Sequence, residues 1–408
     1  MEMQSKAENR SSIAKEEEYL LELLCQELSG KEAHGHKEQL DWIRFMQMAE
    51  RHGVISLLYH SLAEGEHTPG QVKAMSRDIS RAIVQQNYRL LFLSKFLVEQ
   101  LKKADIPVVL LKGVGTAGYY PVPELRKAGD VDLLLLEPEK LEAAGEVLQK
   151  CGFKEKERQV ALHHIVYETE QGIEIELHTM LVEPFDNQRI NRYIKNKQKD
   201  CARNVRWTEV MGIQLPVLNT AYHGYELLMH MLQHYLRSGF GLKLLCDWVV
   251  FWKEETDPIE QEKYIKLVEE SGVKGFSDII TLLCCRYLGL EESKLQWMKL
   301  QKYPDVDEML LEILEAEAFG KSSGERMVAL RGNGLLDYIR EFHHQMQLNF
   351  PKQGKCVLLW PGLWLITLVR FLRNNRSLRK VSSMDVLKMA GKRGKLIKKM
   401  NLFTIMKK

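Results

Sequence analysis

One stretch of the chain, residues 110–136, constrains the fold more than any other. It reads LLKGVGTAGYYPVPELRKAGDVDLLLL, so two apolar runs enclose a connection rich in glycine, tyrosine and proline. The second run opens with Asp130-Val131-Asp132, and alternation along a strand puts both carboxylates on one face. Adjacent carboxylates repel each other, and a cation that prefers oxygen ligands, Mg²⁺ or Mn²⁺, relieves the repulsion. The stretch therefore predicts a metal-binding strand, with two solvated acids at a strand edge as the simpler alternative.

The segments around this stretch predict a small mixed sheet. A tight turn and a short helix connect the first two strands, and Pro138 opens a helix that Gly152 closes. Gln171-Gly172 marks the turn of a β-hairpin. The expected strands are residues 106–111, 130–136, 163–169 and 173–180, with a short fifth strand at 214–217.

Helical periodicity dominates the rest of the chain, so we expect an α+β protein whose small sheet is flanked by helical regions. The sequence divides into four predicted segments. These are an N-terminal helical region at 1–105, the α/β core at 106–184, a helical substrate or cap region at 185–334, and basic C-terminal helices at 335–408.

A third acid is expected from the hairpin strand IEIELHTM. Glu174, Glu176 and His178 share one face of that strand. If the strand lies beside Asp130 and Asp132, one of its acids completes a triad that neutralises phosphate through metal ions or accepts a proton. The alternative is an exposed hairpin face with solvated acids. Glu176 is preferred because it stands beside His178.

Several short motifs together resemble the nucleotidyltransferase superfamily typified by DNA polymerase β. Within it, the chain is similar to a poorly characterised bacterial branch with the patterns L-K-G, Y-P-x-P-x-L-R, G-D-[IV]-D-L and acid-L-H. The matching segments are 111–113, 120–126, 129–133 and 176–178, and the similarity extends to His230, His234, Lys243 and Asp247. It covers roughly residues 80–250.

This resemblance implies roles for individual residues. It implies that Asp130 and Asp132 bind the metal, and that Glu176 is the third acid, either a base or a further ligand. It also implies that Gly113 forms the phosphate-binding turn, with Lys112 or Arg126 as a phosphate contact. The positions expected around the substrate cleft are His178, His234, Lys243 and Asp247.

The activity expected from the resemblance is Mg²⁺-dependent transfer of a nucleoside monophosphate from an NTP such as ATP to a hydroxyl-type acceptor. The acceptor is an unidentified small molecule, peptide or protein. Two departures from the superfamily pattern keep alternatives open: Val114 follows Gly113, and the gap to Asp130 is long. The alternatives are a kinase-like phosphotransferase that uses the same site, and a catalytically inactive binding module with the same fold.

His230 and His234 lie four residues apart, a spacing that suits zinc on a helix. Neither a following glutamate nor a nearby cysteine pair completes such a site. We therefore favour packing, a hydrogen bond to Asp247, or a place in the substrate cleft for these histidines.

The C-terminal end of the chain is basic, although the net charge of the whole chain is only +3. Residues 370–408 hold thirteen Lys and Arg against one acid, and the apolar run 356–369 precedes them. A solvated basic helix is the simplest interpretation. Peripheral membrane contact through 356–408 is the next, and nucleic acid binding is less favoured. Seven cysteines without a C-x-x-C motif and a polar N-terminus predict a cytoplasmic protein.

Overall fold

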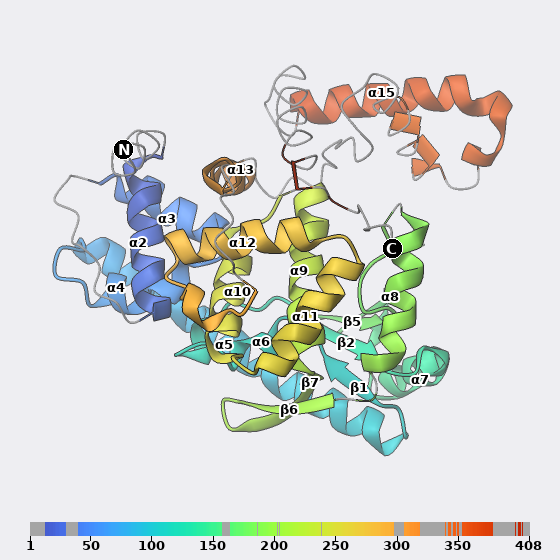
Figure 1. Cartoon of the computed structure of the whole chain (residues 1–408), viewed down its shortest axis with the longest axis horizontal. Helices are drawn as coiled ribbons and strands as arrows, with labels where there is room; N and C mark the ends of the chain where they lie inside the picture. The colour runs from blue at the N-terminus through green and yellow to red at the C-terminus, as the bar shows by residue number, and fades with distance from the viewer. Residues whose placement is uncertain are drawn as a thin grey trace.

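The computed structural model describes residues 13–29, 40–156, 164–297 without 186, 202, 204 and 238, 306–318, 353–377, and single positions between 339–350 and 396–402. Within these residues, a seven-stranded mixed sheet is surrounded by helices (Figure 1). The predicted α+β fold class is confirmed. Most of the basic segment predicted after residue 335 lies outside the described residues.

The sheet has the strand order β3-β4-β5-β2-β1-β7-β6. Strand β2 lies near its centre, antiparallel to β1 and parallel to β5, and β1 is also parallel to β7. Hairpins β4–β5 and β6–β7 flank this centre. The strands are β1 Val108–Leu110, β2 Val131–Leu135, β3 Lys154–Glu155, β4 His164–Glu168, β5 Glu174–His178, β6 Val205–Val210 and β7 Ile213–Leu218.

All five strands expected from the sequence are present, and the hairpin that turns at Gly172 is confirmed. Two strands were missed, β3 and β6. Strand β6 lies at an edge of the sheet and reads Val-Arg-Trp-Thr-Glu-Val, with Trp207 exposed, so it lacks a continuous apolar face. Strand β7 is the fifth strand expected at 214–217, and β6 pairs with it to form that edge of the sheet, while the other described elements after Pro184 are helices, as expected.

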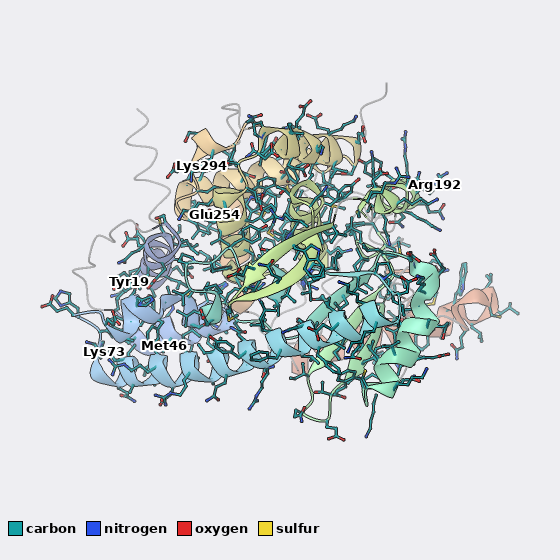
Figure 2. The ribbon with its side chains drawn as sticks, turned by 90° about the horizontal axis from the view of Figure 1, so that it is seen from below. Tyr19, Met46, Lys73, Arg192, Glu254 and Lys294 are labelled. Atoms are coloured by element: carbon teal, nitrogen blue, oxygen red, sulfur yellow. The ribbon has the colours of Figure 1, made fainter. Side chains whose placement is uncertain are left out.

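One face of the sheet packs against helices α5 Gly70–Lys103 and α7 Leu141–Lys150. With 34 residues, α5 is about 50 Å long. It crosses the underside of the molecule from the end marked by Lys73 (Figure 2). The odd-numbered residues of β2, Val131, Leu133 and Leu135, join this core. Alternation then turns Asp132 and Leu134 toward the opposite face.

The opposite face lies under α9 Thr220–Arg237 and α10 Leu242–Glu254, which belong to the larger hydrophobic core. That core also contains the N-terminal helices, so segments far apart in the sequence share one apolar interior. The remaining helices of five or more residues are α2 Lys15–Ser29, α3 Trp42–Arg51, α4 Tyr59–Ala63, α8 Gln188–Cys201, α11 Pro258–Glu270, α12 Lys274–Tyr287, α13 Val306–Ala318 and α15 Trp360–Ser377.

Short helical turns connect several of these elements: η1 Ile55–Leu58, α6 Val114–Ala117, η2 Pro123–Leu125, η3 Pro138–Lys140, η4 Glu292–Lys294, η5 Gln353–Lys355 and η6 Val357–Leu359. Helix α6 is the short helix expected between the first two strands, and η3 begins at Pro138 as expected. None of the helices in the described part of the chain has the length and apolar character needed to cross a membrane.

Candidate active site

Strands β2 and β5 bring the predicted acids together. They pair in parallel with Asp132 opposite Glu176, so the neighbouring position proposed for the third acid is confirmed. Asp132 and Glu176 share the sheet face that α9 and α10 cover. Asp132 is only 2% exposed, whereas Glu176 is partly accessible. A buried, ionised carboxylate needs compensating charge, and the neighbouring side chains supply it.

Asp132 is paired on one oxygen only. Its Oδ1 accepts hydrogen bonds from Lys112 Nζ at 2.6 Å and from His178 Nε2 at 3.1 Å. Burial alone would favour the neutral acid, but Lys112 and His178 hold the pKa of Asp132 well below its usual range. Its Oδ2 is buried and has no hydrogen-bond partner among the described residues. This oxygen is therefore an open acceptor beside a charged site.

His178 connects two of the acids. Its Nε2 lies 3.2 Å from Glu176 Oε2 as well as contacting Asp132. Burial opposes a charged imidazole, but the hydrogen bonds to Asp132 and Glu176 outweigh it and raise the pKa of His178 to about 9. The hydrogen bond from His178 lowers the pKa of Glu176. Glu176 is accordingly ionised at neutral pH and is a weak proton acceptor there.

Asp130 has the opposite electrostatic environment. Burial and the neighbouring Asp132 raise its pKa to about 6, although Lys112 pulls in the other direction. It forms no hydrogen bond or ion pair with any described residue. An acid in this state is stabilised by a cation brought to the site.

Gly113 forms the turn that leads from β1 toward this cluster. Its φ of 68° and ψ of −119° lie in a region open almost only to glycine. The turn places Lys112 against Asp132 and starts helix α6 at Val114. A residue with a side chain would be strained here whatever the available space, which explains why the L-K-G motif ends in glycine.

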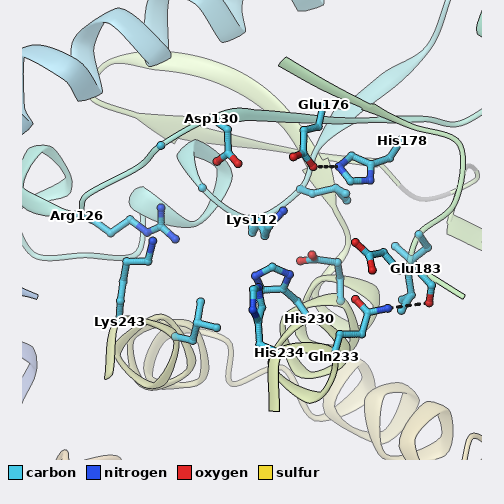
Figure 3. A pocket seen from close by; sticks show the side chains of 17 residues that line it. Lys112, Arg126, Asp130, Glu176, His178, Glu183, His230, Gln233, His234 and Lys243 are labelled. Carbon is cyan, nitrogen blue, oxygen red and sulfur yellow. Dashed lines mark hydrogen bonds and ion pairs between the residues drawn. The ribbon is translucent and has the colours of Figure 1, made fainter. Parts of the chain in front are cut away.

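A pocket of about 460 Å³ lies between the sheet and the helices. Asp130 and Glu176 project from the sheet side, and His230, Gln233 and His234 face them from α9 (Figure 3). The other predicted site residues on its lining are Lys112, Gly113, Arg126, His178 and Lys243. The structure therefore gathers these predicted residues around one cavity, with Asp132 directly behind Lys112. Their individual roles stay predictions.

Asp247 lies outside the pocket lining, behind Arg126. Its Oδ1 accepts from Tyr120 Oη at 2.8 Å and from Arg126 Nε at 3.0 Å, and its Oδ2 accepts from Arg126 Nη2 at 2.7 Å. Both carboxylate oxygens are thus paired. Arg126 donates two hydrogen bonds to Asp247, so only the rest of its guanidinium is available to a ligand.

Lys243 is the second cation of the pocket, and Figure 3 shows it beside Arg126. Burial, together with nearby Arg126, lowers the pKa of Lys243 to about 8. Its Nζ makes no hydrogen bond or ion pair with the described residues. An anionic ligand such as phosphate would stabilise the charged form of this amine.

Glu226 is the main residue that the sequence reasoning missed. It lies on α9, is 4% exposed, lines the pocket, and has an Oε2 without a hydrogen-bond partner among the described residues. Burial raises its pKa to about 7. A signal was present in the sequence, because Glu226 is an acid inside the apolar helix AYHGYELLMHML, one turn before His230.

The donors fit a divalent cation that binds oxygen. Asp130, Glu176 and the open Oδ2 of Asp132 supply carboxylate oxygens, the ligands that Mg²⁺ and Mn²⁺ prefer. A second donor set shares Glu176: one ligand atom each from His164, Glu176 and His178 lies within 4.8 Å of the others. Imidazole nitrogens favour a transition metal at that second set.

Three comparisons with known proteins complete the description. The sequence profile of a family described as "Uncharacterised nucleotidyltransferase" matches residues 38–289, more than half of the chain. A solved structure, an antigenic nucleotidyltransferase-like protein from Paracoccidioides brasiliensis, is 18% identical over 44% of this chain and 87% of that one, with a TM-score of 0.28. No curated protein matches the chain.

Proposed function

The chain belongs to the family of uncharacterised nucleotidyltransferases, and we propose that it moves a nucleoside monophosphate from an NTP to a hydroxyl-type acceptor. The acceptor oxygen would attack the α-phosphorus, and the bond from that phosphorus to the bridging oxygen of pyrophosphate would break. The acceptor proton would pass to a carboxylate of the site. The products would be the nucleotidylated acceptor and pyrophosphate.

One observation carries this proposal: the unpaired Oδ2 of Asp132 is buried behind Lys112, at the edge of a pocket that Asp130, Glu176 and two lysines line. These acids would hold Mg²⁺ or Mn²⁺, which would neutralise phosphate charge and lower the pKa of the attacking hydroxyl. Lys112 and Lys243 offer ammonium groups to the phosphate oxygens, and Arg126 contributes the part of its guanidinium that Asp247 leaves free.

The two sides of the pocket differ in a way that suggests where each substrate binds. Asp130, Lys112 and Gly113 on the sheet side suit the metal and the triphosphate. Glu226 and His230 on α9 then face the acceptor. Glu176 is tied to His178, whereas Glu226 has an open oxygen and a pKa near 7, so Glu226 is the better placed proton acceptor.

Thermal stability against each NTP, with and without Mg²⁺, tests the nucleotide site. A ligand at a hundred times its Kd stabilises the protein by about 2.7 kcal/mol. We expect a metal-dependent shift in the wild type that disappears in Asp132→Asn. Glu174→Gln is the matched control, because Glu174 is an acid on β5, the strand that pairs with β2, but lies outside the pocket lining, and it should keep the shift. No shift with any NTP would contradict the proposal.

A non-catalytic binding module is a second candidate, and one observation favours it. Asp132 already has two cationic partners, Lys112 and His178, which compete with a metal ion for the carboxylate. Such a module would bind nucleotide and leave it intact. The mass of candidate acceptors after incubation with NTP and Mg²⁺ separates the functions: a nucleotidyl adduct supports the proposal, a phosphate adduct indicates a kinase, and unchanged nucleotide indicates the module.

A further inference from the structure

The surface formed by η6 and the first half of α15, residues 357–369, is unusually apolar. Fifteen large hydrophobic side chains are exposed among the described residues, and seven of them lie in this short segment. Leu358, at 91%, is the most exposed of all. Single exposed hydrophobic residues are common, but a contiguous group marks a surface that is covered by something else.

Among the residues whose burial is described, helix α15 buries only one narrow stripe. Leu363 and Thr367 are buried, and Trp364 Nε1 donates to His343 Nδ1 at 3.1 Å. The remaining sides of the same turns expose Leu365, Ile366, Leu368 and Val369. The first half of α15 is therefore apolar on almost every side, and a helix of this kind is normally buried on every side. Helix α15 lies along one edge of the molecule, where such surroundings can reach it (Figure 1).

The charge of the adjoining sequence indicates which surroundings these are. Arg370 follows the apolar segment directly, and residues 370–408 contain thirteen Lys and Arg against a single acid, Asp385. Basic residues next to an apolar helix face match the anionic headgroups and the acyl chains of a membrane surface. A nucleic acid would satisfy the charges but would leave Leu358 and its neighbours in water.

We propose that residues 357–369 insert into the headgroup–acyl boundary of a membrane, and that the excess of positive charge in the sequence from Arg370 onward makes anionic lipid the favoured surface. The apolar run 356–369 is shorter than the roughly 20 residues that span a bilayer, so the segment would lie in the interface rather than cross it. This proposal goes beyond the nucleotidyl transfer and does not depend on it.

Co-sedimentation of the full chain with vesicles tests the proposal. The vesicles contain phosphatidylcholine alone or phosphatidylcholine mixed with phosphatidylglycerol. We expect the wild type to bind the mixed vesicles and to bind the neutral ones far less. Leu358→Glu/Leu365→Glu changes two exposed side chains, so the fold should persist, and it should lower the vesicle partition coefficient by about tenfold or more.

The control variant is Ile43→Glu/Ile259→Glu, which adds the same charge at exposed apolar positions of α3 and α11. It should bind like the wild type, and both variants should keep the wild-type melting temperature. Equal binding by the two double variants would overturn the proposal, as would binding that ignores phosphatidylglycerol. A wild type that ignores vesicles but is a dimer made monomeric by Leu358→Glu/Leu365→Glu would assign the surface to a second copy instead.

Discussion

Two buried carboxylates, Asp132 beside Lys112 and Asp247 beside Arg126, have different surroundings. Both are almost inaccessible to solvent, and both contact a basic side chain. Asp247 has partners on both oxygens, from Arg126 and Tyr120. Asp132 has partners on Oδ1 alone, and its Oδ2 is open.

The difference separates a structural ion pair from a binding site. The pair around Asp247 ties the connection between β1 and β2, where Tyr120 and Arg126 lie, to helix α10. Its hydrogen-bond capacity is largely used, so it offers little to a ligand. The region around Asp132 keeps an acceptor unpaired, and an unpaired buried acceptor costs free energy unless a ligand satisfies it.

The largest change in stability should come from breaking the ion pair between Asp247 and Arg126, in which both carboxylate oxygens have partners. Asp247→Ala leaves the Arg126 guanidinium buried without its anion, so we expect the free energy of unfolding to fall by about 3–5 kcal/mol. Urea denaturation measures it. The double variant Arg126→Met/Asp247→Leu removes both charges and should recover most of the loss. A loss below about 1 kcal/mol in the single variant would show that Asp247 is not a structural anchor.

The next effect is a dependence of stability on pH that arises from His52. Its Nδ1 accepts a hydrogen bond at 3.4 Å from the backbone N–H of Leu242, in the first turn of α10. Burial and the nearby Arg51 lower the pKa of His52 to about 3. Below pH 6.5 the unfolded chain protonates this histidine, whereas the folded protein keeps it neutral down to about pH 3. The free energy of unfolding therefore falls as the pH decreases from 6.5 toward 3. We expect about 2 kcal/mol to be lost between pH 7.5 and pH 5.

The measurement is the difference in unfolding free energy between the wild type and His52→Gln at both pH values. The wild-type advantage should shrink at pH 5. His60→Gln, at an exposed position on α4, serves as the control and should show no such change. A wild-type advantage that stays constant with pH would contradict the prediction.

A smaller effect tests the second partner of Asp247, the hydroxyl of Tyr120. Tyr120→Phe removes one hydrogen bond to a buried charge and should destabilise the protein by about 1.5 kcal/mol. Tyr88→Phe removes a similar bond, to Glu124, at an exposed site and should cost far less. Thermal or urea unfolding of both variants gives the comparison. Equal losses would mean that burial is not what makes the Asp247 pair strong.

The smallest effect is on metal affinity and tests whether Asp132 binds a metal ion. Lys112→Met removes the cation that occupies Oδ1, so Mn²⁺ should bind the nucleotide-free protein about tenfold more tightly, a difference of about 1.4 kcal/mol. Calorimetry or the electron paramagnetic resonance of Mn²⁺ measures it. Arg126→Met/Asp247→Leu removes both charges of the Asp247 ion pair and should leave Mn²⁺ affinity nearly unchanged. Weaker Mn²⁺ binding in Lys112→Met would contradict a metal site at Asp132.

Much of the fold around the site is predictable from local patterns. The apolar runs at 106–111 and 130–136 indicated β1 and β2, and Gln171-Gly172 indicated the β4–β5 hairpin. Strand β6 was not predicted because it is an edge strand with Arg206 half-buried and Trp207 and Glu209 exposed, so it carries no apolar periodicity. Glu226 was not predicted as a site residue because helical periodicity alone does not show which cavity a helix will face.

The local conformation of each segment follows from its own residues. Alternation in Asp130-Val131-Asp132 sets which face the carboxylates share, and Gly113 permits a turn that other residues resist. Which charges meet depends instead on how distant segments pack together. Asp132 and His178 lie 46 residues apart, and Arg126 and Asp247 lie 121 apart. With α9 and α10 packed on the sheet, both Asp247 oxygens have hydrogen-bond partners, whereas one Asp132 oxygen has none among the described residues. The reason is that the partners of a buried charge come from the distant segments that pack against it.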